Sequence, residues 1–177
     1  MILMGLDVAS TTGIARWDLN RSEASILCST IKSPTKINGS RIFDEQVAYR
    51  LTNEFRADLK RNGIPDYVVM EAPMKRGPNA DTIALMNTLT GAMTGVVAAI
   101  GCRFEVVASS EWRKAVYGFG TKRGWASKDW KRHARESAQQ MGIVFSGDDE
   151  AEAALIAFYG GRCSQTVKMM RSNNVEA

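Results

Sequence analysis

The chain has 177 residues, 45% hydrophobic and 24% charged, so its composition is that of one globular domain and excludes a disordered or collagen-like chain. Its three cysteines form no Cys-x-x-Cys pair, which argues against zinc, and no basic segment precedes the short apolar N-terminal run, so we expect reduced thiols and a cytoplasmic location. The net charge of +4 is uneven, because residues 103–135 carry nine basic and three acidic side chains, and this favours a polyanionic partner.

The N-terminal part of the chain predicts three strands followed by a helix. Residues 2–8 are almost continuously apolar, as in a buried strand, and residues 13–18 and 24–31 partly alternate, as in a meander. After a loop, Ser40 can cap a helix. Asn62-Gly63 can end the helix, and apolar residues recur in it at every fourth position: Phe43, Val47, Leu51, Phe55 and Leu59.

The rest of the chain predicts two further strands and the helices that follow them. The strands are expected at residues 67–70 and 103–108. Capping residues and terminal glycines predict helices at residues 82–101, 111–117, 128–141 and 149–159. The uncharged segment from Thr82 to Cys102 is long enough to cross a membrane, but its polar residues and glycines favour a buried helix, so no membrane partner is expected.

Together these elements predict an α/β fold in which one mixed sheet is covered by helices on both faces. The first three strands are expected to be antiparallel, and the next two parallel to the first. We expect a single domain over residues 1–163 and a frayed polar tail over residues 164–177.

Four carboxylates occupy the ends of apolar segments. Asp7 ends the first predicted strand, Glu71 ends the fourth, and Asp149 and Glu152 lie one turn apart at the start of the last helix. A carboxylate at the end of a buried strand is costly unless a cation compensates it, and several carboxylates together repel each other. Oxygen ligands of this kind suit Mg²⁺ or Mn²⁺. The pattern therefore predicts metal-dependent cleavage of a phosphodiester.

Most of these acids also have a structural interpretation. Acidic residues in the first turn stabilise a helix through its dipole, which would account for Asp149 and Glu152. Asp7 can form a turn at a strand end. Glu71 precedes Ala72-Pro73, where no turn chemistry requires a glutamate, so the combination of the acids favours a metal site.

Three segments carry a resemblance to a known family: Gly5-Leu6-Asp7-Val8-Ala9-Ser10-Thr11-Thr12-Gly13-Ile14-Ala15, Val68-Val69-Met70-Glu71-Ala72-Pro73 and Asp149-x-x-Glu152-Ala153-Ala154. In order and spacing they resemble the RuvC-type Holliday junction resolvases of the ribonuclease H-like superfamily, over residues 2–160. The resemblance implies a ribonuclease H-like mixed five-stranded sheet. It also implies two Mg²⁺ ions per active site, with Mn²⁺ as a substitute, and catalytic, metal-binding roles for Asp7, Glu71, Asp149 and Glu152.

The chain departs from the family pattern at several positions. Val8-Ala9 replaces the usual Pro-Gly, and Glu152 is one methylene longer than the usual Asp, which leaves Asp148 as an alternative ligand. The loop after Glu71 often carries an aromatic side chain that enters the junction, and Met74 is the nearest candidate here. These departures favour a phage or mobile-element branch of the family.

The basic tract predicts the DNA-binding face. Its lysines and arginines can pair with phosphates or form a solvated surface, and the interleaved Trp125 and Trp130 can stack on bases or pack in the core. With the loop after the fourth strand, the predicted DNA-binding residues are Met74, Lys75, Arg76, Arg113, Lys114, Lys122, Arg123, Lys128, Lys131 and Arg135.

These features predict a homodimeric, Mg²⁺-dependent endonuclease that resolves four-way DNA junctions and leaves a 5′ phosphate and a 3′ hydroxyl. Gly91-x-x-x-Gly95 favours close helix packing, within the fold or across a two-fold axis that matches a junction. The alternatives are a ribonuclease H-like nuclease for RNA–DNA hybrids or general branched DNA, and a non-catalytic DNA-binding protein of the same fold. A sugar-kinase or actin-type ATPase is disfavoured because it needs a second phosphate motif and a much longer chain.

Overall fold

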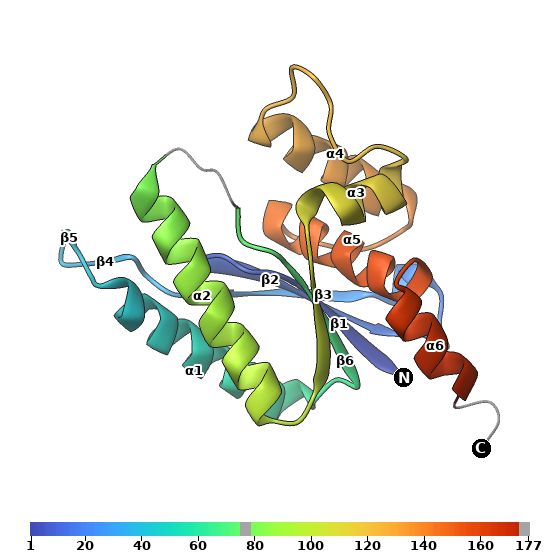
Figure 1. The fold of residues 1–177 in the computed structure, drawn as a ribbon, viewed down its shortest axis with the longest axis horizontal. Helices are drawn as coiled ribbons and strands as arrows, with labels where there is room; N and C mark the ends of the chain where they lie inside the picture. The colour runs from blue at the N-terminus through green and yellow to red at the C-terminus, as the bar shows by residue number, and fades with distance from the viewer. Residues whose placement is uncertain (75–78, 174–177) are drawn as a thin grey trace.

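The computed structural model describes residues 1–74 and 79–173, which are built around one five-stranded sheet (Figure 1). The strand order is β3-β2-β1-β6-β7. The strands are β1 (Ile2–Asp7), β2 (Thr11–Asp18), β3 (Leu27–Lys32), β6 (Tyr67–Glu71) and β7 (Arg103–Val107). The β1–β2 and β2–β3 pairs are antiparallel, whereas β6 is parallel to both β1 and β7. The predicted mixed sheet is therefore confirmed.

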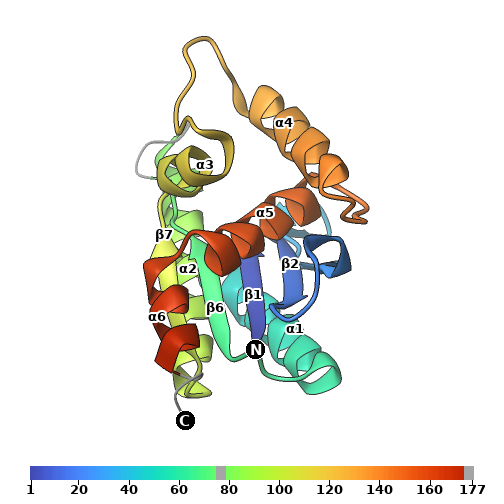
Figure 2. The same ribbon diagram turned by 90° about the vertical axis from the view of Figure 1, so that its right-hand side faces the viewer.

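Helices cover both faces of the sheet, as Figures 1 and 2 show. The helices are α1 (Asp44–Asn62), α2 (Ala80–Ala99), α3 (Ser109–Tyr117), α4 (Ser127–Gln140), α5 (Asp148–Arg162) and α6 (Gln165–Asn173), with a 3₁₀ turn η1 (Glu23–Ser25). The helices α1 and α2 pack together on one face, and α5 lies across β1 and β2 on the other, in contact with α3, α4 and α6. Two hydrophobic clusters fill these layers, one on each side of the sheet.

Strand alternation decides which side chains reach which layer. In β1, Met4 and Leu6 point into the cluster under α1 and α2, whereas Leu3 points into the cluster under α5. Since successive side chains of a strand point to opposite faces, Asp7 lies on the α5 face. The same alternation in β6 puts Glu71 on that face.

The helix α5 lies in direct backbone contact with β1 and β2. A Cβ atom on Gly5 would lie 2.4 Å from the carbonyl oxygen of Ala153, and one on Gly13 would lie 1.9 Å from that of Asp149. Only glycine fits at both positions because any side chain would overlap with the helix backbone. This close approach brings the N-terminus of α5 to the end of β1, where Asp7 lies.

The segment before α1 differs from the prediction. Ser40 does not cap a helix but lies in β5 (Ser40–Arg41), which pairs with β4 (Lys36–Ile37). The two residues between them, Asn38 and Gly39, both have positive φ, 50° and 81°, as a tight hairpin turn requires. This Asn-Gly turn outweighs the capping preference of Ser40, and α1 begins after Phe43 instead.

The predicted frayed tail is also wrong over residues 165–173, which form α6, whereas residues 174–177 lie outside the described residues. Val167 is fully buried, and Met170 packs against the cluster under α5. The two apolar side chains are three residues apart, which places them on the same face of a helix that can dock on the core.

The long helix α2 is buried along one side only. Leu89, Thr90, Met93 and Val97 are its buried residues. By length and composition the helix could cross a membrane, and only 22% of its most apolar window is buried. The prediction of a buried helix therefore holds for one face of α2, and none of the described residues covers the opposite face.

Candidate metal centre and nucleic-acid interface

The carboxyl ends of β1 and β6 are neighbours, because these strands are parallel and hydrogen-bonded. Their last residues, Asp7 and Glu71, therefore project from adjacent strands onto the face that α5 covers. The N-terminus of α5 adds Asp149 and Glu152 to the same cleft, whose volume is about 660 Å³. The structure thus gathers all four predicted metal-binding residues in one cleft, which we call the acidic cleft.

Three of the four acids form a tight group. One carboxylate oxygen each from Asp7, Asp149 and Glu152 lies within 4.8 Å of the other two. Glu71 lines the same cleft but is not part of this group. Asp148 is not part of it either, and its carboxylate is paired with Arg135 instead. Within the described part of the chain, the geometry favours Glu152 over Asp148 as the metal ligand.

Glu71 is oriented by two donors from α3. The Ser109 hydroxyl donates to Oε1 of Glu71, and the indole N–H of Trp112 donates to Oε2 over 2.8 Å. Trp112 is fully buried. The guanidinium carbon of Arg113 lies over its ring, 5.1 Å from the ring centroid. Both oxygens of Glu71 are therefore held in place through one buried side chain and one hydroxyl.

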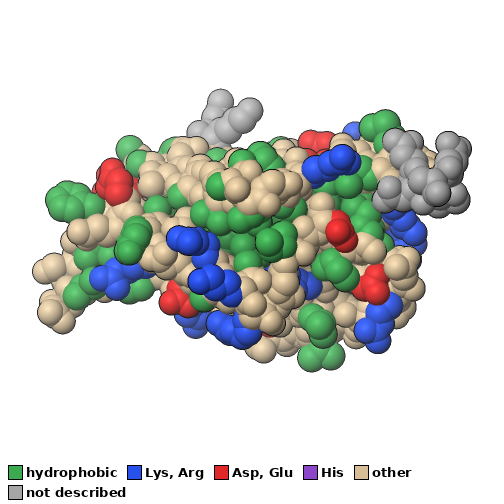
Figure 3. All heavy atoms as spheres, turned by 90° about the horizontal axis from the view of Figure 1, so that it is seen from below, with side chains coloured by type: hydrophobic (Ala, Val, Ile, Leu, Met, Phe, Trp, Pro, Cys, Tyr) green, Lys and Arg blue, Asp and Glu red, His purple; other side chains and the backbone are tan. Residues whose placement is uncertain are grey.

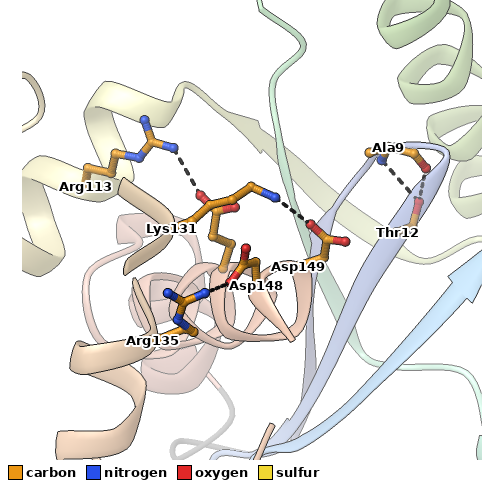
Figure 4. Close-up of polar contacts among 8 residues, drawn as sticks. Ala9, Thr12, Arg113, Lys131, Arg135, Asp148 and Asp149 are labelled. Carbon is orange, nitrogen blue, oxygen red and sulfur yellow. Dashed lines mark hydrogen bonds and ion pairs between the residues drawn. The ribbon is translucent and has the colours of Figure 1, made fainter. Parts of the chain in front are cut away.

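Cations from α3 and α4 reach the acids of α5, as Figure 4 shows. Arg113 lies 3.3 Å from Oε1 of Glu152, and the ammonium of Lys131 lies 3.1 Å from Oδ1 of Asp149. These residues were expected to pair with phosphates. They contact the acids instead because carboxylates that are this close and this buried require nearby positive charge.

Burial and mutual repulsion raise the pKa values of two of the acids. The pKa of Asp7 is well above its ordinary value, chiefly through burial and then through the charges of Glu152, Glu71 and Asp149. Burial, and next the charge of Glu71, raises the pKa of Glu152 to about 7. A divalent cation would relieve both effects, and a set made only of carboxylate oxygens matches the preference of Mg²⁺ or Mn²⁺. The donor chemistry therefore fits the metal that the sequence predicts.

We expect the stability of the metal-free protein to fall as pH rises from about 4.5 to about 7, in part through Glu152. Over this window the unfolded state loses the proton of Glu152 while the folded state keeps it, so deprotonation favours unfolding. The contribution is on the order of 3 kcal/mol. Urea unfolding with a chelator at several pH values checks this, and Glu152→Gln should flatten the decline. An equal decline in the variant would show that Glu152 is not responsible.

Trp112→Phe should weaken divalent-metal binding by about 10-fold, because it removes the N–H that orients Glu71 and keeps an aromatic ring. The matched control is Trp17→Phe. Trp17 is also buried, and its N–H donates to the carbonyl of Arg21 over 3.1 Å, outside the cleft. Both variants should lose about 1 kcal/mol of stability, and only Trp112→Phe should lose affinity in a calorimetric titration with Mn²⁺. Equal Mn²⁺ affinity in the two variants would contradict an orienting role for Trp112.

The other predicted DNA-binding residues are divided by the structure. Met74, 46% exposed, lies at the edge of the acidic cleft, and Lys122 lies over the ring of Trp125 at 4.3 Å. Arg123 and Lys128 are exposed. Lys114 faces a separate hollow that Glu105 and Glu111 also line, because adjacent residues of a helix point in different directions. Lys75 and Arg76 lie outside the described residues.

Two parts of this site were missed by the sequence analysis. Ser109 and Ser110 are alternative caps for the helix predicted at residues 111–117, but the hydroxyl of Ser109 binds Glu71 instead. His133, in a basic stretch with no obvious partner, packs against Tyr117 with ring centroids 4.5 Å apart. It belongs to an aromatic cluster whose members are Tyr117, Phe119, Trp125, Trp130 and His133. The density of aromatic residues between positions 117 and 133 was the available signal.

Solved structures of Holliday junction resolvases share this fold. RuvC from T. thermophilus in complex with a Holliday junction substrate has a TM-score of 0.67 and 14% sequence identity, over 96% of both chains. A structure of Thermus thermophilus RuvC has a TM-score of 0.57 and 16% identity, over 90% of this chain and 95% of that one. The yeast mitochondrial Holliday junction resolvase Ydc2 has a TM-score of 0.57 and 15% identity, over 96% of this chain and 81% of that one.

No protein-family model matches the sequence, and no curated protein matches it. The low identities mean that the structural likeness establishes the fold alone. The predicted RuvC-type, ribonuclease H-like fold is therefore confirmed.

Proposed function

We propose that this protein is a Mg²⁺-dependent endonuclease that resolves four-way DNA junctions. The observation that carries the proposal is the group of three carboxylates within 4.8 Å of one another, with Glu71 in the same cleft. It occurs in a fold shared with RuvC in complex with a Holliday junction. The basic residues around the cleft support a DNA substrate.

The chain's own residues have distinct roles in this proposal. Asp7, Glu71, Asp149 and Glu152 would hold two Mg²⁺ ions through carboxylate oxygens. Bound there, Mg²⁺ would supply the activation of a water molecule and the stabilisation of the leaving 3′ oxygen, so the expected products carry a 5′ phosphate and a 3′ hydroxyl. Lys131 lines the same cleft and would pair with phosphate oxygens of the bound strand.

The test is cleavage of a synthetic mobile four-way junction with and without Mg²⁺, with nicks mapped on all four strands. We expect paired nicks on opposed strands only when Mg²⁺ or Mn²⁺ is present. A flap and an RNA–DNA hybrid are the comparison substrates. Preferential cutting of either would favour the more general nuclease, and junction binding without any cutting would favour a non-catalytic protein.

We further propose a homodimer formed through the uncovered face of α2. Gly91 and Gly95 are exposed there, and a Cβ atom on either would meet no other atom within 4 Å, so the fold itself does not use this glycine spacing. Figure 3 shows a face of the molecule on which uncharged side chains gather between charged ones. The α2 segment from Thr82 to Ala99 contributes no charge.

Gly95→Leu should leave the monomer folded and lower the mass seen in ultracentrifugation from two chains to one.

A further inference from the structure

A second hollow, of about 690 Å³, opens beside the acidic cleft. Six residues line both spaces: Ala72, Met74, Ser109, Arg113, Trp125 and Trp130. We call the second space the tryptophan hollow. The two spaces therefore adjoin, and one is acidic whereas the other is aromatic.

The lining of the tryptophan hollow differs in charge from the acidic cleft. None of the described residues that line it is acidic, and it contains two cations, Arg113 and Lys122. The guanidinium carbon of Arg113 lies 4.6 Å from the ring centroid of Trp130, and the ammonium of Lys122 lies 4.3 Å from that of Trp125. Indole rings and a guanidinium plane stack with flat aromatic ligands, and the cations pair with phosphate. This combination fits a nucleotide.

The walls of the tryptophan hollow are held in place before any ligand arrives. The Trp125 ring meets three others nearly edge to face: Phe119 at 5.8 Å, Trp130 at 4.8 Å and His133 at 5.3 Å between centroids. The loop that carries it packs closely against α3 at Gly120, where a Cβ atom would lie 2.0 Å from the carbonyl oxygen of Ser110. A site that is already ordered loses less entropy when it binds.

Polar groups in the same wall can read the edge of a base. The hydroxyl-bearing residues Ser110 and Thr121 line the tryptophan hollow beside the aromatic rings. Each hydroxyl can donate or accept one hydrogen bond according to its orientation. Aromatic stacking alone tolerates every base, so these hydroxyls are the source from which a preference among bases can arise.

We propose that the tryptophan hollow binds one unstacked nucleobase of the strand held for cutting, next to the phosphate in the acidic cleft. This inference rests on the proposed function, because a strand in the acidic cleft places its neighbouring nucleotide in the adjoining space. The base stacks on Trp125, Lys122 moves to a flanking phosphate, and the choice of base contributes to the cut-site preference.

The experiment removes the base and the ring separately and together. Four-way junctions with a single abasic position, placed in turn at each nucleotide within three of the mapped cut, are titrated against the protein by fluorescence anisotropy without Mg²⁺. At one position the wild-type protein should bind about 10-fold more weakly, the equivalent of one base–aromatic stack. Trp125→Ala should lose about the same factor with the intact junction and nothing further with the abasic one.

Control variants distinguish a loss of base stacking from a loss of folding. Trp125→Phe keeps a ring and should recover most of the affinity. Tyr49→Ala removes an aromatic side chain that is 69% exposed on α1, away from the hollow, and should bind as the wild type does. Melting curves identify a misfolded variant, and the abasic series with the wild-type protein needs no variant.

The outcomes distinguish the two proposals. If the wild-type protein neither binds nor cuts the junction, the proposed function fails. If it cuts the intact junction but no abasic position changes its affinity, the base-binding site alone is overturned. Equal losses on removal of the base in wild type and Trp125→Ala would likewise overturn it, because the base would then bind elsewhere.

Discussion

Asp7→Asn should abolish cleavage while junction binding is kept. The change preserves the shape of the side chain and removes the charge at the centre of the three-carboxylate group. Transition-state stabilisation by bound metal is worth several kcal/mol, so we expect a loss of at least about 10³-fold in the cleavage rate. The basic side chains around the cleft are untouched, so the dissociation constant for the junction without Mg²⁺ should change little.

We expect a second effect of Asp7→Asn, on the stability of the metal-free protein. Because burial and the neighbouring acids raise the pKa of Asp7, its ionised form is unfavourable in the metal-free protein. Asp7→Asn should therefore melt at the same or a higher temperature than the wild type in the presence of a chelator. Glu45→Gln, at an exposed position of α1 with the same loss of one charge, is the control and should cut normally. Normal cleavage by Asp7→Asn would refute the assignment of the site.

Gly13→Ala should impair both folding and cleavage. The new Cβ atom would lie 1.9 Å from the carbonyl oxygen of Asp149, so α5 must move away from β2. Overpacking of this kind costs about 1–3 kcal/mol or more. The displaced helix carries Asp149 and Glu152, and a shift of about 1 Å at reacting groups can lower a rate about 10²-fold.

Gly147→Ala is the matched control for this displacement. Gly147 precedes α5 directly, its φ of −159° is extended, and a Cβ atom there would meet no other atom within 4 Å. Urea unfolding and cleavage rates should therefore stay near those of the wild type. If Gly13→Ala were as stable and as active as Gly147→Ala, the direct contact of α5 with the sheet would not be needed to place the acids.

The sheet and the four acids were predictable because both follow from local patterns. Apolar segments of strand length identify β1 and β6, and an acid at the end of each lies at the same edge once the strands are parallel. The i, i+3 spacing of Asp149 and Glu152 sets them on one side of a helix. These local signals predicted the fold that the structure has, and they predicted the acids that it gathers.

The partners of the acids were not predictable in the same way. Whether Arg113 reaches a phosphate or Glu152 depends on the angle at which α3 approaches α5, and no local pattern determines that angle. Lys114, one residue later, faces a different hollow because adjacent residues of a helix point in different directions. Trp112 has the apolar character of any core residue, and its link to Glu71 joins positions 41 residues apart. The Asn38-Gly39 turn, by contrast, could have been predicted from its local sequence, but Ser40 was interpreted as a helix cap instead.

The ion pairs of Figure 4 also bear on whether this protein can fold before it binds metal. Lys131 and Arg113 already offset part of the negative charge of Asp149 and Glu152, and two large apolar clusters hold the chain together. We therefore expect the chain to fold without bound metal, although metal would add stability by compensating the buried acids, whereas small zinc domains unfold when their metal is removed. If the proposed Mg²⁺ dependence holds, a cell depleted of magnesium would keep folded but inactive protein, and return of the ion would restore activity without new synthesis.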